Sequence, residues 1–240
     1  MSSIDVMKRR EEEIASLISY LSGKSNGFTS PKLVVIGGYA IRAFVPFSRY
    51  SRDCDFVMKA GLNLIEKWTP ENVNVEALER KGAHAFMRWV KILQAGSREK
   101  VKLGLYFMEG AVVGRENEIF WIDDAFLGNS RKVEIKIGSS RIRVFVPSYE
   151  DFFILKVMSG RRSDIRDIAA LVWKNGVPKA LEKRLGALND PDIFRRNLRE
   201  KIIPDIRNRL FLNSWRGTFI TSEFTERDKE SVAGRLEGLL

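Results

Sequence analysis

The sequence predicts an α/β (α+β) protein in which a mixed sheet flanked by helices is followed by a helical domain. Short apolar or alternating segments between turn residues occur up to residue 146 and are typical of strands. Beyond Pro147, apolar residues instead recur at helical spacing. The chain has 240 residues, of which 44% are hydrophobic, and can hold one large domain or two small ones. We therefore predict a first domain at residues 1–147 and a helical domain at residues 148–240.

The spacing of apolar residues predicts the elements of the first domain. Alternating residues at 133–137 and 142–146, separated by turn residues at 138–140, predict a β-hairpin. The other expected elements are an amphipathic helix at about 3–22, a strand at 33–36, a short helix at 39–44, a strand at 53–59, a helix at 70–82, and strands at 86–93 and 101–107.

Ser148 is expected to cap the first helix of the second domain, because Asp151 follows it at capping-box spacing. Helices are then expected at 151–158, at 164–174 and from Pro178 to the end.

The charge balance indicates a polyanionic partner. Lysine and arginine number 41 against 31 aspartates and glutamates, which gives a net charge of +10 and a sequence pI of about 9.8. Such a charge attracts phosphates over long distances, although an ordinary solvated surface is the alternative. No apolar run is long enough to cross a bilayer, and the first residues lack the pattern of a signal peptide. The single cysteine excludes an intrachain disulfide framework or a cysteine-based zinc cluster, so we expect a cytoplasmic protein.

Two aspartates open the strand expected at 53–59. Strand side chains alternate between faces, so Asp53 and Asp55 lie on one face and repel each other unless a cation lies between them. Carboxylate oxygens are ligands that Mg²⁺ prefers, and one or two ions can be held in this way. Upstream, Gly37 and Gly38 form a turn whose backbone N–H groups are free to hold phosphate. Together these residues predict a site for a metal-bound nucleoside triphosphate, and the alternative is an acidic pair that faces solvent.

The order of these motifs resembles a known family. Ile36-Gly37-Gly38 followed by Arg49-x-Ser51-x-Asp53-x-Asp55 resembles the first motif of the DNA polymerase-β-type nucleotidyltransferase superfamily. The group that it resembles most contains the AbiEii toxin-like nucleotidyltransferases. The hairpin, the helix with Lys156 and the later Asp164-x-x-Asp167 are similar to that group's later motifs. The resemblance covers about residues 30–175.

The resemblance implies a nucleotidyltransferase fold and an enzyme that moves a nucleotide from a nucleoside triphosphate to an acceptor hydroxyl with Mg²⁺. Gly37 and Gly38 would hold the triphosphate, Asp53 and Asp55 would hold magnesium, and Lys156 and Asp164 would line the catalytic site. Likeness to toxin-like members implies RNA as the acceptor, such as the 3′ end of a tRNA. A protein side chain or a small molecule is an alternative acceptor. A cognate antitoxin protein is a further expected partner.

Several residues of the motifs have two interpretations. Arg42, Arg49 and Ser51 are candidate nucleotide-binding residues. Alternatively, Arg42 is a surface residue, Arg49 offsets the charge of the two aspartates, and Ser51 starts the strand. Lys156 lies in an apolar helix, where a charge is costly unless it is paired, so it is either a site residue or a lysine that reaches the surface. Asp164 and Asp167 alternatively only place charge at the start of a helix.

One departure from the family concerns a third carboxylate, which many members carry on a later strand. The candidate strand at 101–107 has none, and Gly104 stands at the expected place. Glu109, Glu118 or Asp164 could substitute, a second metal ion could be weakly held, or catalysis could have been lost. The alternative function is therefore a catalytically degenerate module that binds nucleotide, RNA or a partner protein.

The C-terminal helices combine basic residues with aromatic ones. Arginine beside Phe194, Phe211 and Trp215 can hold single-stranded RNA by stacking and phosphate contact. The alternative is an amphipathic helical domain with these aromatic residues in its core.

Overall fold

The chain divides into two compact units. In the computed structural model, the described residues are 3–47, 49–94, 100–114 and 117–240. Unit 1 comprises the described residues of Met1–Ala43, Tyr50–Val112 and Ile122–Pro147, and unit 2 those of Phe44–Arg49, Val113–Trp121 and Ser148–Leu240. The described residues of Phe44–Arg49 and Val113–Trp121 precede Pro147 but belong to the unit of the C-terminal helices. The predicted division of the chain at a single boundary does not include this grouping.

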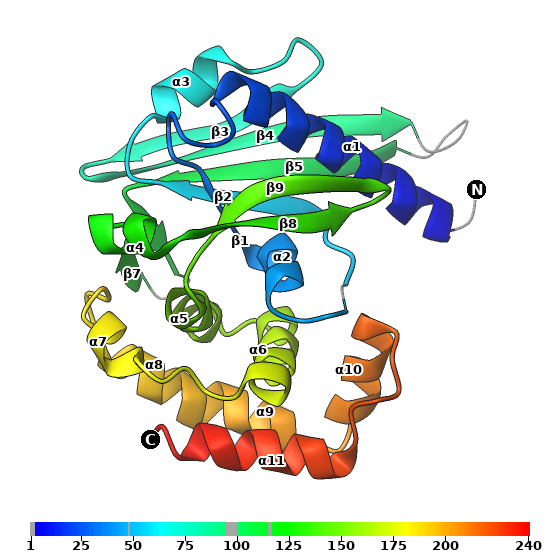
Figure 1. Ribbon diagram of the computed structural model, residues 1–240, viewed down its shortest axis with the longest axis vertical. Helices are drawn as coiled ribbons and strands as arrows, with labels where there is room; N and C mark the ends of the chain where they lie inside the picture. Colours follow the sequence, from blue (N-terminus) through cyan, green and yellow to red (C-terminus); the bar gives the residue numbers. More distant parts are fainter. Residues whose placement is uncertain (1–2, 48, 95–99, 115–116) are drawn as a thin grey trace. The chain divides into compact units, whose positions relative to one another are not determined.

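Unit 1 contains a seven-stranded mixed sheet with the order β3-β4-β5-β2-β1-β9-β8 (Figure 1). β2 runs parallel to β5 and β1 runs parallel to β9, while the other neighbours are antiparallel. The predicted mixed sheet is therefore confirmed. Its strands are β1 (Val34–Ile36), β2 (Asp53–Met58), β3 (Asn74–Lys81), β4 (His84–Gln94), β5 (Lys100–Glu109), β8 (Arg131–Ile137) and β9 (Ser140–Val146). A further short strand, β6, spans Ala111–Val113.

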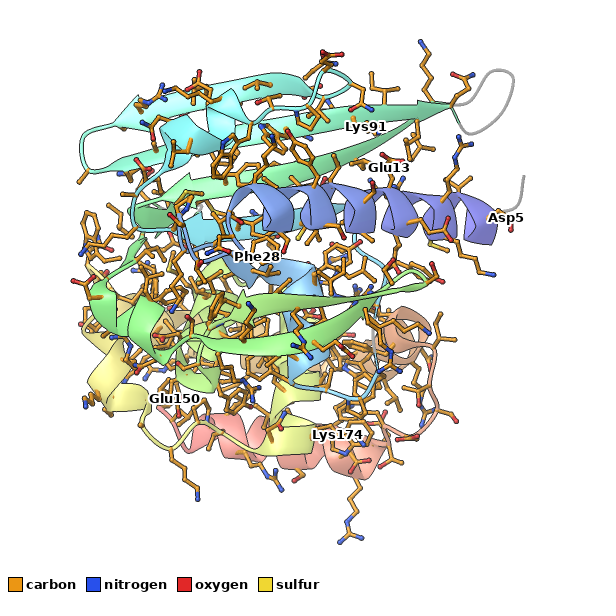
Figure 2. All side chains as sticks on the ribbon, turned by 45° about the horizontal axis from the view of Figure 1, so that its top comes forward. Asp5, Glu13, Phe28, Lys91, Glu150 and Lys174 are labelled. Atoms are coloured by element: carbon orange, nitrogen blue, oxygen red, sulfur yellow. The ribbon has the colours of Figure 1, made fainter. Side chains whose placement is uncertain are left out.

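Helix α1 (Ser3–Lys24) covers one face of this sheet and contacts β5, β8 and β9. Its buried face contains Ile14, Leu17, Ile18 and Leu21, as the predicted amphipathic pattern requires. Figure 2 shows Glu13 of α1 beside Lys91 of β4, and the two side chains form an ion pair. The other helices of unit 1 are α2 (Gly37–Ala40), its 3₁₀ continuation η1 (Ile41–Ala43), α3 (Leu62–Lys67) and α4 (Asp124–Asn129).

The helix predicted at 70–82 is wrong, because this segment contains the strand β3. Glu76, Leu78 and neighbouring residues favour a helix in isolation. In the folded chain, however, β3 pairs with β4 along its whole length and forms one edge of the sheet. Its side chains are almost all exposed, so the strand has no buried face, and apolar and polar residues do not alternate along it. Tertiary hydrogen bonding therefore overrides the local preference.

Unit 2 is almost entirely helical. The serine cap is confirmed, since the Ser148 side chain accepts a hydrogen bond from the Asp151 backbone N–H at 3.1 Å. The helices are α5 (Tyr149–Ser159), α6 (Arg162–Asn175), α7 (Leu181–Leu185), α8 (Asp192–Asn197), the π-helical η2 (Leu198–Ile202), α9 (Ile203–Arg207), α10 (Phe211–Phe219) and α11 (Glu226–Glu237). A short strand, β7 (Ile119–Trp121), completes the unit. No helix among the described residues has the length and apolar content that a membrane crossing requires.

Aromatic contacts explain why residues 44–49 belong to unit 2. Phe44 stacks on Phe152 of α5, with ring centroids 4.9 Å apart. Phe47 packs edge-on against Trp215 at 5.6 Å and also lies against Trp173. These contacts bury large apolar rings, and they hold the segment on the helices.

Candidate functional site

Asp53 and Asp55 lie at the start of β2 and share one face of the sheet. In the register of the sheet, Asp53 pairs with Gly104 of β5 and Asp55 pairs with Tyr106. On the other side of β2, Asp55 pairs with Ile36 of β1. Laterally paired residues point to the same face, so the two carboxylates and the Tyr106 side chain lie on a common surface. Both aspartates are half-buried.

Gly37 follows Ile36 directly and brings the backbone against Asp55. Its φ is +68°, and an added Cβ would lie 2.0 Å from the Asp55 Oδ2 atom. Only glycine fits this position, because any side chain would collide with the carboxylate and the backbone is left-handed. Gly38 is buried in α2, which is only four residues long. Any phosphate binding here would therefore depend on the N–H groups of the turn and not on a long helix dipole.

Gly37→Ala is expected to destabilise the protein by at least about 2 kcal/mol, since it adds a steric clash to an unfavourable φ. Asp55→Ala removes the clashing oxygen and leaves a Cβ–Cβ distance of 3.4 Å. The double variant should consequently lose less stability than the sum of the two single variants, and urea unfolding measures this coupling. Gly128→Ala is the control, because an added Cβ there meets nothing within 4 Å. A Gly37→Ala variant as stable as the Gly128→Ala variant would contradict this geometry.

The electrostatics of Asp53 favour a bound cation. Burial raises the pKa of Asp53 above its usual value, and nearby Arg88, Arg10 and Arg52 and the Gly104 backbone N–H offset the effect only in part. The ionised form of Asp53 is therefore less favourable here than in water, and a nearby cation would stabilise it. The described residues contain no cluster of three or more histidine, cysteine, aspartate or glutamate side chains able to hold a metal. Two carboxylates suit Mg²⁺, which commonly takes its remaining ligands from water and substrate phosphates.

Gly104, which stands where a third carboxylate is expected, lies close to Asp53. An added Cβ there would lie 2.8 Å from Asp53 Oδ1 and 3.3 Å from Tyr106 Cε2. A side chain at position 104 would therefore require the Asp53 carboxylate to move away from β5. Glu109 does not supply the missing carboxylate, because its carboxylate accepts a hydrogen bond from the Leu62 N–H at 2.7 Å, at the start of α3. Glu118 is buried and belongs to unit 2.

Ser51 and Arg42 have structural partners within unit 1. The Ser51 hydroxyl donates to the Asp53 backbone carbonyl at 2.9 Å, which fixes the start of β2. The Arg42 guanidinium forms a buried ion pair with Glu11 of α1 and donates to the Lys136 carbonyl at 2.6 Å. These contacts assign Arg42 to the packing of α1 on the sheet, and its predicted nucleotide contact has no further support.

Unit 2 contains a buried charge cluster formed by Arg49, Lys156, Ser159, Asp164 and Asp167. Lys156 Nζ donates to Asp164 Oδ1 and to Asp167 Oδ2, both at 2.7 Å. Arg49 binds Asp167 through two hydrogen bonds of 2.7 and 2.8 Å, and the Ser159 hydroxyl donates to Asp164 at 2.7 Å. Lys156 is 3% exposed and Asp167 is fully buried. The cluster therefore pairs two cations with two anions, and it is held out of water.

The cluster favours the charged forms of its members. Burial alone would lower the pKa of Lys156, but Asp164 and Asp167 raise it above its usual value. Burial would likewise raise the pKa of Asp164, but Lys156, Ser159 and Arg49 lower it. Sequence reasoning singled out Arg49, Lys156 and Asp164, and the structure brings all three together. It missed the role of Asp167, although its position one helical turn after Asp164 places both carboxylates on one face.

The aromatic residues of the C-terminal helices lie in the core. Phe194, Phe211 and Trp215 are all buried, and the Trp215 indole N–H donates to the Arg166 carbonyl at 3.0 Å. Their rings are therefore not available for stacking on RNA bases. The alternative interpretation, an amphipathic helical domain with these rings inside, is the one that the structure shows.

Comparison with known proteins gives one family match. Residues 122–185 match a family model described as a nucleotidyltransferase of unknown function (DUF6036). This segment is about a quarter of the chain; it includes Lys156 and Asp164 but not Asp53 or Asp55. No curated protein matches the chain.

Two similar solved structures come from Helicobacter pylori. One is described as a nucleotidyltransferase, with 14% identity, a TM-score of 0.44 and coverage of 95% of this chain and 98% of that chain. The other is JHP933, with 14% identity, a TM-score of 0.44 and coverage of 95% and 94%. Both TM-scores are below 0.5, so we base neither the fold nor the function on these two structures.

Proposed function

We propose that this protein is a Mg²⁺-dependent nucleotidyltransferase that moves a nucleoside monophosphate from a nucleoside triphosphate to an acceptor hydroxyl. The observation that carries the proposal is the pair Asp53 and Asp55 on one face of β2, with the Gly37 backbone packed against the Asp55 carboxylate. The family match at 122–185 supports the same reaction class.

The roles follow from the chemistry of the residues. Asp53 and Asp55 would hold Mg²⁺, which would neutralise the charge that develops on the phosphates. The backbone N–H groups of Gly37 and Gly38 would hold the triphosphate next to Asp55. In the reaction, a bond forms between the acceptor oxygen and the α-phosphorus, the bond to the bridging oxygen breaks and pyrophosphate leaves. The proton of the hydroxyl passes to water.

We assign the unit 2 charge cluster to the internal packing of unit 2 rather than to chemistry on the phosphates. All its charges are already balanced by short hydrogen bonds among Arg49, Lys156, Asp164 and Asp167. A buried cation with two carboxylate partners has little attraction left for a phosphate.

RNA is the acceptor that we propose, because the chain carries a net charge of +10 and resembles toxin-like members. The experiment incubates total cellular RNA with each of the four α-labelled triphosphates, with Mg²⁺ or with EDTA. If the protein transfers nucleotides to RNA, a labelled RNA band should appear with at least one triphosphate, and it should require Mg²⁺. Absence of label with every triphosphate, in RNA and in the protein itself, would reject the proposed reaction.

A second candidate is a degenerate module that binds nucleotide or RNA without turnover. The glycine at position 104 favours it, since β5 then adds no carboxylate beside Asp53. Calorimetry with each triphosphate separates the two candidates. If the protein is an enzyme, nucleotide binding should depend on Mg²⁺ and the RNA assay should show transfer. If it is a degenerate module, RNA or nucleotide should bind without any labelled product. A cognate antitoxin remains a prediction of the resemblance.

A further inference from the structure

A single row of paired residues crosses the sheet of unit 1 through the carboxylate site. Asp55 pairs with Ile36 on one side and with Tyr106 on the other, and Tyr106 pairs with Arg88 of β4. Neighbouring strands are about 4.8 Å apart, so Arg88 lies about 10 Å from Asp55 across the sheet. The turn at Gly37 and the side chain of Arg88 therefore flank the carboxylates from opposite sides on the same face.

The Arg88 guanidinium is held by stacking, and its charge acts on Glu76 and on Asp53. Its Cζ atom lies over the Tyr106 ring, 4.9 Å from the ring centroid. Its Nη1 is 3.5 Å from Glu76 Oε2, which is longer than a normal hydrogen bond, while Lys102 donates to the same oxygen at 2.6 Å. Among the described residues, its Nε has no hydrogen-bond partner, but this atom is itself buried. The side chain as a whole is 29% exposed, so a ligand can reach its exposed part.

We propose that Arg88, held against the Tyr106 ring, binds a phosphate of a nucleic-acid acceptor strand. The inference rests on the proposed function, in which the triphosphate occupies the Gly37 side of the carboxylates. In phosphoryl transfer the attacking and leaving oxygens are roughly in line, so the acceptor must approach from the side of Tyr106 and Arg88. A guanidinium is the group best suited to bind a phosphate there.

The test measures binding without catalysis. A fluorescently labelled single-stranded RNA oligonucleotide is titrated with the protein in EDTA, with no nucleotide present, and anisotropy gives Kd at several salt concentrations. Arg88→Gln is expected to weaken binding by about tenfold, the value of one charge-assisted hydrogen bond. The slope of log Kd against the logarithm of the salt concentration should also fall by about 0.7, which is the value for one phosphate contact to a single strand.

Two further variants make the result specific. Arg80→Gln is the matched control, because Arg80 lies on exposed β3 and pairs with Glu66, away from the carboxylate face. It should leave Kd within about twofold of the wild type, as expected for an exposed ion pair. Arg88→Lys keeps the charge but loses the stacked fork, so it should fall between the wild type and Arg88→Gln. If Arg88→Gln does not fold, as shown by circular dichroism, the Arg88→Lys variant carries the test.

Magnesium tripolyphosphate serves as a probe for the donor side. The charge at position 88 acts on Asp53, so the variant for this comparison is Arg88→Lys, which keeps that charge and should bind the probe as tightly as the wild type does. The proposal is overturned if the wild type does not bind RNA, if Arg88→Gln binds RNA like Arg80→Gln, or if Arg88→Lys loses tripolyphosphate affinity but not RNA affinity. Because this assay contains no reaction, loss of RNA binding in Arg88→Gln supports the subsite even where the transfer assay yields no product.

Discussion

Asp55→Asn is expected to lower the rate of nucleotide transfer by at least about a thousandfold, because a metal ion supplies several kcal/mol of transition-state stabilisation. Asparagine keeps the shape of the side chain but removes the charge that Mg²⁺ requires. Asp53→Asn should have a comparable effect, since both carboxylates lie on one face of β2. The measurement is the rate of label transfer at saturating Mg²⁺, together with the Mg²⁺ dependence of nucleotide affinity.

The stability of Asp53→Asn distinguishes a functional carboxylate from a structural one. The pKa of Asp53 is raised in the folded protein by burial, so its ionised form reduces stability at neutral pH. This cost is absent at a pH below the pKa of the unfolded chain, where both states are protonated. Asp53→Asn should therefore increase the free energy of unfolding at pH 7 without Mg²⁺, and the gain should disappear in acid.

Asp124→Asn is the matched control for both substitutions. Asp124 lies in α4, and its ion pair with Lys59 is largely exposed, so the change should alter neither transfer nor stability appreciably. Transfer that persists in Asp53→Asn and Asp55→Asn at the rate of Asp124→Asn would remove the carboxylate pair from the mechanism.

Lys156→Met is expected to lower the free energy of unfolding by about 3–5 kcal/mol. The substitution leaves two buried carboxylates, Asp164 and Asp167, and Arg49 then pairs only with Asp167. Urea unfolding gives the value. Adding Asp164→Asn to this variant restores the charge balance, since Arg49 still pairs with Asp167. The double variant should therefore be more stable than Lys156→Met alone.

The destabilisation by Lys156→Met should depend on pH in a defined way. The pKa of Asp164 is lowered, so its stabilising effect is present above the usual aspartate pKa and is lost as pH falls through the folded value. The pKa of Lys156 is raised, so its effect is present below the usual lysine pKa and is lost as pH rises through the folded value. The difference between the two proteins should thus be greatest near neutral pH and shrink at both extremes.

Lys59→Met provides the reference for an exposed pair and should cost no more than about 1 kcal/mol. An equal loss for Lys156→Met and Lys59→Met would show that the buried cluster contributes little to stability.

The sequence predicted those features that a local period or a single strong motif specifies. The alternation around Asp53 and Asp55 places both carboxylates on one face in any strand, and the structure has them on one face of β2. Buried strands such as β1, and helices with a buried face such as α1, were located for the same reason. The strand β3 was not, because its exposed side chains follow no period.

By itself, the sequence determined the class of fold and the carboxylate pair, and it singled out Arg49, Lys156 and Asp164, because periodicity and residue type are local properties. Only the tertiary structure decided the partners of those residues. In the folded chain, Arg42 pairs with Glu11, and Asp167 pairs with both Arg49 and Lys156. Arg88 lies beside Tyr106 in the row of paired residues that contains Asp55. These pairings join residues that are distant in the chain, and only strand register and helix packing select them.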